Sequence, residues 1–342
     1  IVRPKDIVVN CMNVIIGSVG MSQYTGCLSP VYYVLRTRRS DDLPEYFEAV
    51  FKIKRFQHCL TRIGNGILAH RMRIPMELLK CELMPRPPLA EQRAIVQYLH
   101  DAERKTRKFI HNRRRLIEVL NERKQAIINR AVTRGLDPNA PLKPSGVDWL
   151  GVIPKQWEAT TLGRLVRTFK TGPFGSILHQ SDYVRGGIPL VNPVHMSGGR
   201  IAPDENCAVD DATFYRLREY ALAEGDIVFS RRGELGRCAL VRKEEAGWLI
   251  GTGSIRARLV PGAVDANYLL AALQGRWVSD YLSLMSVGAT TQNLNTGILS
   301  RVPLPLPPIE EQRQIPLFIE REFGRLDEAV HKAKREIDLI RE

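Results

Sequence analysis

Apolar residues recur at alternating spacings of four and three along two stretches of the chain. In the first stretch the recurring positions are Ile95, Leu99, Ala102, Thr106, Phe109, Arg113, Leu116, Leu120 and Ile127. In the second they are Ile315, Ile319, Leu326, Ala329, Ala333 and Ile340. This spacing, sustained over about four heptads in the first stretch, is typical of a coiled-coil seam. We predict two long helices that pair antiparallel with each other; the alternative is an amphipathic helix lying on a globular core.

Each predicted helix opens with the same signature. Pro87–Arg93 reads Pro-Pro-Leu-Ala-Glu-Gln-Arg, and Pro307–Arg313 reads Pro-Pro-Ile-Glu-Glu-Gln-Arg. Proline suits the first turn of a helix, and acidic residues there complement its N-terminus. Asp6-Ile7-Val8 recurs as Asp226-Ile227-Val228 at the same offset of 220 residues. Two anchors with one offset indicate an internal repeat.

The repeat predicts the ends of both helices and the start of the second copy. Gly135 is a plausible cap for the first helix, and Pro316 should bend the second helix or delay its start. Only five residues precede Asp6, whereas a long segment precedes Asp226, so we expect the chain to begin inside the first copy. The predicted divisions are a partial first domain, a long helix, a linker, a complete second domain and a second helix, at 1–87, 88–134, 135–148, 149–306 and 307–342.

The segment 149–306 mixes strand and helix patterns. Short apolar runs at 188–191, 226–229 and 238–241 predict buried strands, and alternation at 255–260 predicts a half-exposed strand. A helix is predicted over 267–284. The fold class is therefore α+β, with two such domains, the first one partial, joined by two antiparallel coiled-coil helices.

The net charge of the chain bears on what it binds. Lysine and arginine total 50 against 37 acidic residues, giving a net charge of +13 and a pI near 9.6. Such a surplus favours a polyanion, although a basic solvated surface is the alternative. The six cysteines form no Cys-x-x-Cys pair, which disfavours zinc and disulfides and suits a reducing cytoplasm. The start of the chain resembles no signal peptide, and no apolar run approaches the roughly 18 residues of a membrane span.

Three loops in 149–306 carry side chains suited to DNA. The first is a flexible basic turn, the second places two arginines directly after a strand, and the third is rich in amides and hydroxyls. Arginine can bind guanine or clamp phosphates, and Gln or Asn can pair with adenine. The alternative for each loop is an ordinary solvated turn. The candidate DNA-binding residues are Lys170, Thr171, Ser176, His179, Ser230, Arg231, Arg232, Arg237, Thr291, Gln292, Asn293 and Asn295.

The sequence carries no recognisable catalytic motif. The glycine-rich stretch at 172–175 lacks the pattern of a P-loop, and the seven histidines form no metalloprotease motif. Asn192-Pro193-Val194-His195 lacks the second proline and the aromatic residue that adenine methyltransferases use on a flipped base. We therefore predict no catalytic residues and no metal site.

Several of these stretches together resemble a known family. Trp149–Glu158, Gly225–Arg231, Gly288–Asn295 and Pro305–Arg313 are similar to segments of the specificity subunit of type I restriction–modification systems. The resemblance covers nearly the whole chain, and the duplicated Pro-Pro-x-x-Glu-Gln signature is its most specific part.

The resemblance implies a cytoplasmic, non-catalytic subunit whose two domains are target recognition domains, each of which binds one half of a bipartite site in double-stranded DNA. It also implies two methyltransferase subunits and restriction/translocase subunits as partners, with S-adenosylmethionine, ATP and Mg²⁺ belonging to those partners. The counterpart of Ser230–Arg232 in the first copy is Asn10–Met12, which carries no arginine. Two alternatives remain: a specificity segment of a fused restriction–methylation enzyme, and a coiled-coil interaction protein that does not bind DNA.

Overall fold

A computed structural model describes residues 1–13, 16–65, 73–148, 150–285 and 294–341. The chain divides into a first unit, Ile1–Asn112, and a second unit, Arg113–Glu342. The boundary lies inside one long helix, α4 (Leu89–Arg134). Helices and strands are mixed in both units, which confirms the α+β prediction.

The first unit holds a small antiparallel sheet in the order β2-β1-β3. Three short α-helices follow the sheet in sequence, and α4 then begins at the third residue of the first signature. The bounds are β1 Ile7–Asn10, β2 Val19–Met21, β3 Tyr32–Leu35, α1 Pro44–Phe51, α2 Lys54–Leu60 and α3 Met76–Leu79.

The second unit is built around an antiparallel sheet in the order β14-β13-β16-β7. Strands β13 and β14 were predicted, and β16 was predicted as half-exposed although its first four residues are buried. The bounds are β7 Val166–Thr171, β13 Ile227–Ser230, β14 Cys238–Leu240 and β16 Ser254–Leu259.

A second sheet of this unit has the order β15-β9-β12-β8, in which β15 and β9 are parallel. The bounds are β8 Tyr183–Val184, β9 Ile188–Val191, β12 Ala208–Val209 and β15 Leu249–Ile250, with α6 Asp211–Arg216 beside them in sequence. Three strand pairs complete the unit: β4 Leu142–Pro144 with β5 Val152–Pro154, β6 Glu158–Thr161 with β17 Pro303–Leu306, and β10 Met196–Ser197 with β11 Arg200–Ile201.

The prediction of a single helix over 267–284 is wrong, because the structure has two helices there. These are α7 (Ala266–Leu273) and α8 (Arg276–Met285). The chain breaks at Gly275, where the Trp277 ring occupies the space that a Cβ would need, 2.0 Å away. The remaining short helices are α5 Leu162–Leu165 and α9 Thr296–Ser300.

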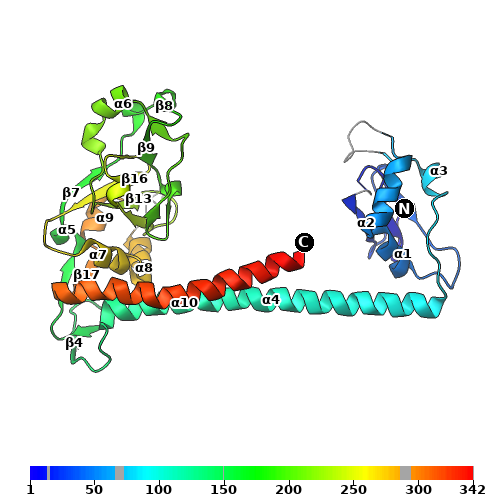
Figure 1. Cartoon of the computed structure of the whole chain (residues 1–342), viewed down its shortest axis with the longest axis horizontal. Coiled ribbons are helices and arrows are strands. Elements are labelled where there is room, and N and C mark those ends of the chain that lie inside the picture. Colours follow the sequence, from blue (N-terminus) through cyan, green and yellow to red (C-terminus); the bar gives the residue numbers. More distant parts are fainter. Residues whose placement is uncertain (14–15, 66–72, 149, 286–293, 342) are drawn as a thin grey trace. The chain divides into compact units, whose positions relative to one another are not determined.

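The two long helices pair antiparallel, as predicted (Figure 1). Within the second unit, Lys124 of α4 bonds to Asp327 of α10 (Ile309–Arg341), and Arg113 lies 2.7 Å from Glu336. Residue numbers thus fall along one helix as they rise along the other. Helix α10 begins upstream of Pro316, so this proline does not delay its start.

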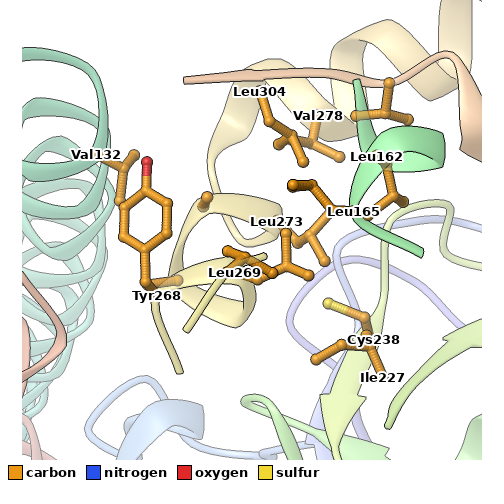
Figure 2. Packing of buried hydrophobic residues seen from close by; sticks show 14 of the residues in the cluster. Val132, Leu162, Leu165, Ile227, Cys238, Tyr268, Leu269, Leu273, Val278 and Leu304 are labelled. Carbon is orange, nitrogen blue, oxygen red and sulfur yellow. The ribbon is translucent and has the colours of Figure 1, made fainter. Parts of the chain in front are cut away.

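The main core of the second unit joins the sheet to both long helices. Figure 2 shows Leu269 and Leu273 of α7 facing Leu162 and Leu165 of α5, while Tyr268 lies against Val132 of α4. All these side chains are buried. The end of α4 is therefore part of the domain core, and Gly135, with φ +74°, ends that helix as predicted.

The internal repeat is confirmed by equivalent hydrogen bonds in the two units. In the first, Arg36 donates to both oxygens of Asp6, at 2.6 and 2.5 Å. In the second, Arg258 donates to both oxygens of Asp226, at 3.0 and 2.8 Å. Each aspartate also accepts from the backbone amide three residues before it, at 2.8 Å in both units. The duplicated aspartate thus fixes the start of the same strand twice.

The signature glutamine works as a clamp in both units. Gln92 accepts from the amide of Leu43 at 2.8 Å and donates to the Pro87 carbonyl at 2.8 Å. Gln312 accepts from the amide of Asp265 and donates to the Pro307 carbonyl at the same two distances. Both glutamines are buried. The signature is therefore a joint between a recognition domain and its helix.

Candidate nucleic-acid interface

The candidate site lies at one end of the sheet β14-β13-β16-β7, which we call the loop end. Here β7 and β13 end and β16 begins, because Thr171 pairs with Ile255 and Ser230 pairs with Ser254. The amide of Arg231 donates to the Gly253 carbonyl at 2.8 Å. The loops that follow β7 and β13 therefore leave the sheet side by side.

The third predicted loop reaches the same end. The amide of Leu294 donates to the Arg231 carbonyl at 3.0 Å. Thr291, Gln292 and Asn293 lie outside the described residues. Asn295 is exposed, and its side chain caps α9 by accepting from the Ile298 amide at 2.8 Å. The loops after β7 and β13 and the described end of the third loop, Leu294 and Asn295, thus meet at the loop end.

Arg231 and Arg232 provide the cationic groups of the loop end. Arg232 is exposed and Arg231 is half-buried. Among the residues that the structure describes, neither guanidinium has a hydrogen-bond or ion-pair partner. A rigid strand that ends in two unpaired guanidiniums is well suited to bind phosphates or the acceptor edge of guanine.

Ser230 has a different place from the arginines that follow it. Its side chain is buried, and its hydroxyl donates to the Arg232 carbonyl at 2.5 Å. It supports the turn from inside and does not face solvent. The sequence could not distinguish these two orientations, because a serine hydroxyl can bond to the nearby backbone as readily as to a ligand.

Arg237 closes the same loop. Its guanidinium donates to one Glu234 oxygen at 3.1 and 2.6 Å and to the Pro193 carbonyl at 3.2 Å. Beyond it, a cavity of about 970 Å³ separates this loop from Lys124 and Asp327 on the paired helices. Arg237 therefore holds the shape of the loop that carries the two arginines.

Lys170 is held by an ion pair that the sequence did not reveal. Its ammonium lies 2.7 Å from Glu219 and 4.8 Å from the centre of the Tyr220 ring. The hydrogen bond from Lys170 lowers the pKa of Glu219. Thr171, the next residue, is half-buried at the end of β7. Glu219 is some fifty residues away in sequence, so no local signal could have found it.

Ser176 and His179 are exposed on the loop after β7. The His179 amide donates to Asp182 at 3.0 Å, and this bond is the main reason that the pKa of Asp182 lies below its ordinary value. Arg216 donates to the same carboxylate at 3.1 Å and to the Ile177 carbonyl at 2.6 Å. The loop is thus tied to α6.

Gly172 sets the path of this loop. A Cβ here would lie 1.9 Å from the Gly251 carbonyl oxygen, so no other residue leaves the backbone in place. Two residues later, Phe174 is 58% exposed. Phe174 is not among the predicted DNA-binding residues, although its position between proline and glycine in a polar loop was a usable signal.

The first unit has a different surface at the equivalent place. Cys11 is buried, and its carbonyl accepts from the Ile74 amide at 2.9 Å, as Arg231 does from Leu294. Met12 is 37% exposed, and its amide donates to the Asn10 side chain. The backbone arrangement is repeated, whereas the cationic side chains are not.

Neither a metal site nor a membrane span was identified in the described part of the chain. No group of three or more His, Cys, Asp or Glu residues there could hold a metal ion. None of the described helices is both long and apolar enough to cross a bilayer.

Comparisons with known proteins agree with these observations. A family model described as the type I restriction modification DNA specificity domain matches residues 154–337. Over 263 residues the chain is 24% identical to the type I restriction enzyme MjaVIII specificity subunit of Methanocaldococcus jannaschii, covering 75% of this chain and 58% of that protein. Over 283 residues it is 23% identical to the EcoBI specificity subunit of Escherichia coli, covering 80% and 59%. The chain therefore spans less than two thirds of these relatives.

Two solved structures share the fold. A chain from a structure of the type I R-M system, described in terms of complex assembly and conformational transition, gives a TM-score of 0.71 at 18% identity. That match covers 99% of this chain and 79% of the other. The HsdS subunit from Thermoanaerobacter tengcongensis gives 0.53 at 18% identity, covering 99% and 80%.

Proposed function

The chain belongs to the family of type I restriction modification DNA specificity domains, and from this premise we propose that it recognises DNA without catalysing a reaction. Its partner is double-stranded DNA, bound at the loop end of the second unit. The observation that carries the proposal is the meeting of the loops after β7 and β13 with Leu294 around Arg231 and Arg232, whose guanidiniums have no partner among the described residues.

The chain acts within a larger complex. We assign it two methyltransferase subunits and restriction/translocase subunits as partners, and a bipartite DNA site. The paired helices α4 and α10 support a scaffolding role, because apolar side chains remain exposed on them within the second unit. These are Leu116, Val119, Leu317, Leu339 and Ile340. S-adenosylmethionine, ATP and Mg²⁺ belong to the partner subunits, and the complex works in the cytoplasm.

Binding to DNA is tested by selection from a randomised duplex pool, followed by fluorescence anisotropy on the selected duplex and a scrambled one. The wild-type chain, assembled with its methyltransferase subunit, should bind the selected duplex more tightly. Arg231→Ala and Arg232→Ala should each weaken binding by about tenfold. If the lost contact is to a phosphate, the salt slope, which is the slope of log affinity against log salt concentration, should also fall in magnitude by about one.

Arg313→Ala is the matched control, because it removes the same charge from an exposed position on α10. Equal affinity for the selected and scrambled duplexes would refute sequence recognition. A coiled-coil protein without DNA binding would give that result while still assembling through its helices.

A further inference from the structure

The loop after β7 displays an aromatic side chain on a firmly anchored tip. Phe174 is 58% exposed, whereas Gly172 and Pro173 before it and Leu178 after it are buried. Single exposed apolar residues are common on proteins and need no explanation by themselves. Phe174 differs from such residues in its position at the loop end and in the hydrogen bonds that hold its loop.

Both ends of the tip are fixed by hydrogen bonds. On one side the Gly172 amide donates to the Ser254 carbonyl at 2.9 Å. On the other side Arg216 donates to the Ile177 carbonyl at 2.6 Å. Gly175 turns the chain between them with a φ of +63°. An apolar side chain on a tip held in this way loses little conformational freedom when it meets a ligand.

The tip belongs to the loop end described above. Gly172 bonds to the carbonyl of Ser254, and Arg231 bonds to the carbonyl of the residue before it. The loop that carries Phe174 and the loop that carries Arg231 and Arg232 therefore leave the sheet on either side of the start of β16. Ile177, 37% exposed, adds a second apolar group to the same loop. An apolar group beside cations is the combination that proteins use to insert a wedge into a DNA duplex.

We infer that Phe174 inserts between neighbouring base pairs of the bound duplex and partly unstacks them. This inference rests on the proposed function and deepens it, because it assigns part of the recognition to the deformability of the DNA. Pyrimidine–purine steps unstack most easily, so the wedge selects for such a step at a position that no hydrogen bond reads.

Affinity gives the first test, with a duplex selected from a randomised pool by the wild-type chain as the probe. Phe174→Ala should weaken binding about ten- to hundredfold, the range found for loss of an aromatic contact with a base. The salt slope should stay unchanged, because no phosphate contact is lost. Phe174→Trp should retain most of the affinity. Thermal unfolding should be unchanged in both variants, because the side chain is largely exposed.

Tyr215→Ala is the matched control. Tyr215 is a 68% exposed aromatic residue of the same domain, on α6, with Arg218 4.5 Å from its ring centre. It should change the affinity less than about twofold. An equal loss in both variants would overturn the inference, since any exposed aromatic residue would then serve.

Unstacking is tested directly by placing 2-aminopurine at each adenine position of the selected duplex in turn. Its fluorescence should rise at one step when the wild-type chain binds, and should not rise with saturating Phe174→Ala. Two results together would overturn the wedge. The first is a loss of affinity in Phe174→Ala although wild-type binding changes the fluorescence at no step. The second is an equal loss of wild-type affinity when one thymine of the duplex is replaced by uracil, because Phe174 would then contact a thymine methyl group.

The two proposals fail separately. If the assembled wild-type chain binds every duplex equally, the proposed function itself is wrong. If it binds selectively through Arg231 and Arg232 while Phe174→Ala binds as tightly as wild type, only the wedge is wrong.

Discussion

Replacing Gln312 with leucine tests how the signature joins a recognition domain to its helix. Gln312 is 3% exposed, and its side chain bonds to the Asp265 amide and the Pro307 carbonyl, both at 2.8 Å. Leucine has a similar volume, so Gln312→Leu removes both bonds without opening a large cavity. The backbone amide and carbonyl are left without this partner.

The expected cost follows from those two groups. An unsatisfied buried donor or acceptor costs about 1–3 kcal/mol, so two of them cost about 3 kcal/mol in the free energy of unfolding once some relaxation is allowed. The effect should be confined to the second unit, because Asp265 caps α7 and α7 packs in the core of that unit.

Tryptophan fluorescence reports on this unit alone. All four tryptophans, at 149, 157, 248 and 277, lie in Arg113–Glu342. In urea, with a slope of about 3 kcal/mol per molar, the loss lowers the midpoint of unfolding by about 1 M. The fluorescence transition should keep its slope.

Two control variants accompany the measurement. Arg313→Ala alters the next residue, which has a 61% exposed side chain paired with Glu310, and should cost less than about 0.5 kcal/mol. Gln92→Leu removes the equivalent bonds from the first unit and should leave the tryptophan midpoint in place. If Gln312→Leu shifts the midpoint no more than Arg313→Ala does, the clamp is not a stabilising joint.

Three further outcomes are expected. Gly172→Ala should distort the loop after β7, because its Cβ would lie 1.9 Å from the Gly251 oxygen. DNA affinity should then fall at least as much as it does in Arg231→Ala. Fluorescence anisotropy measures this, and an affinity equal to that of the wild type would contradict it. Burial raises the pKa of the Cys238 thiol to about 12, so iodoacetamide near neutral pH should not alkylate it before unfolding, as mass spectrometry of the labelled peptide can show. Arg36 lowers the pKa of Asp6, so their pair stabilises β1 fully above the ordinary aspartate pKa and is lost as the pH falls through the lower folded value. The protection factors of the β1 amides, which divide out the intrinsic pH dependence of exchange, should fall in acid in the wild type, and in Asp6→Asn they should be low at every pH.

The repeat could be predicted from sequence because it depends on a few side chains that bond to the backbone. Asp6 and Asp226, like Gln92 and Gln312, keep their identity at one offset since no other residue makes the same pair of bonds. The paired helices were predictable for a similar reason, because their apolar spacing is local.

Positions that depend on distant residues could not be predicted. Arg256 stands in an alternating pattern that indicates exposure, yet it is 6% exposed. Its guanidinium donates to the carbonyls of Glu219 and Ala221, more than thirty residues away in sequence. Lys170 is paired for the same reason with Glu219. A pattern in sequence reports the period of a strand and not the partners that the fold brings to it.

The glutamine clamp has a consequence for how such chains diversify. Because Gln92 and Gln312 form the same pair of bonds, each to the amide at the N-cap of a helix and to the carbonyl of the first proline of the signature, the two joints share one design. The glutamine lies in the signature, and the groups that it bonds to belong to the backbone, which every sequence has. The sequence of a domain can therefore vary widely while the joint that attaches it to its helix stays the same.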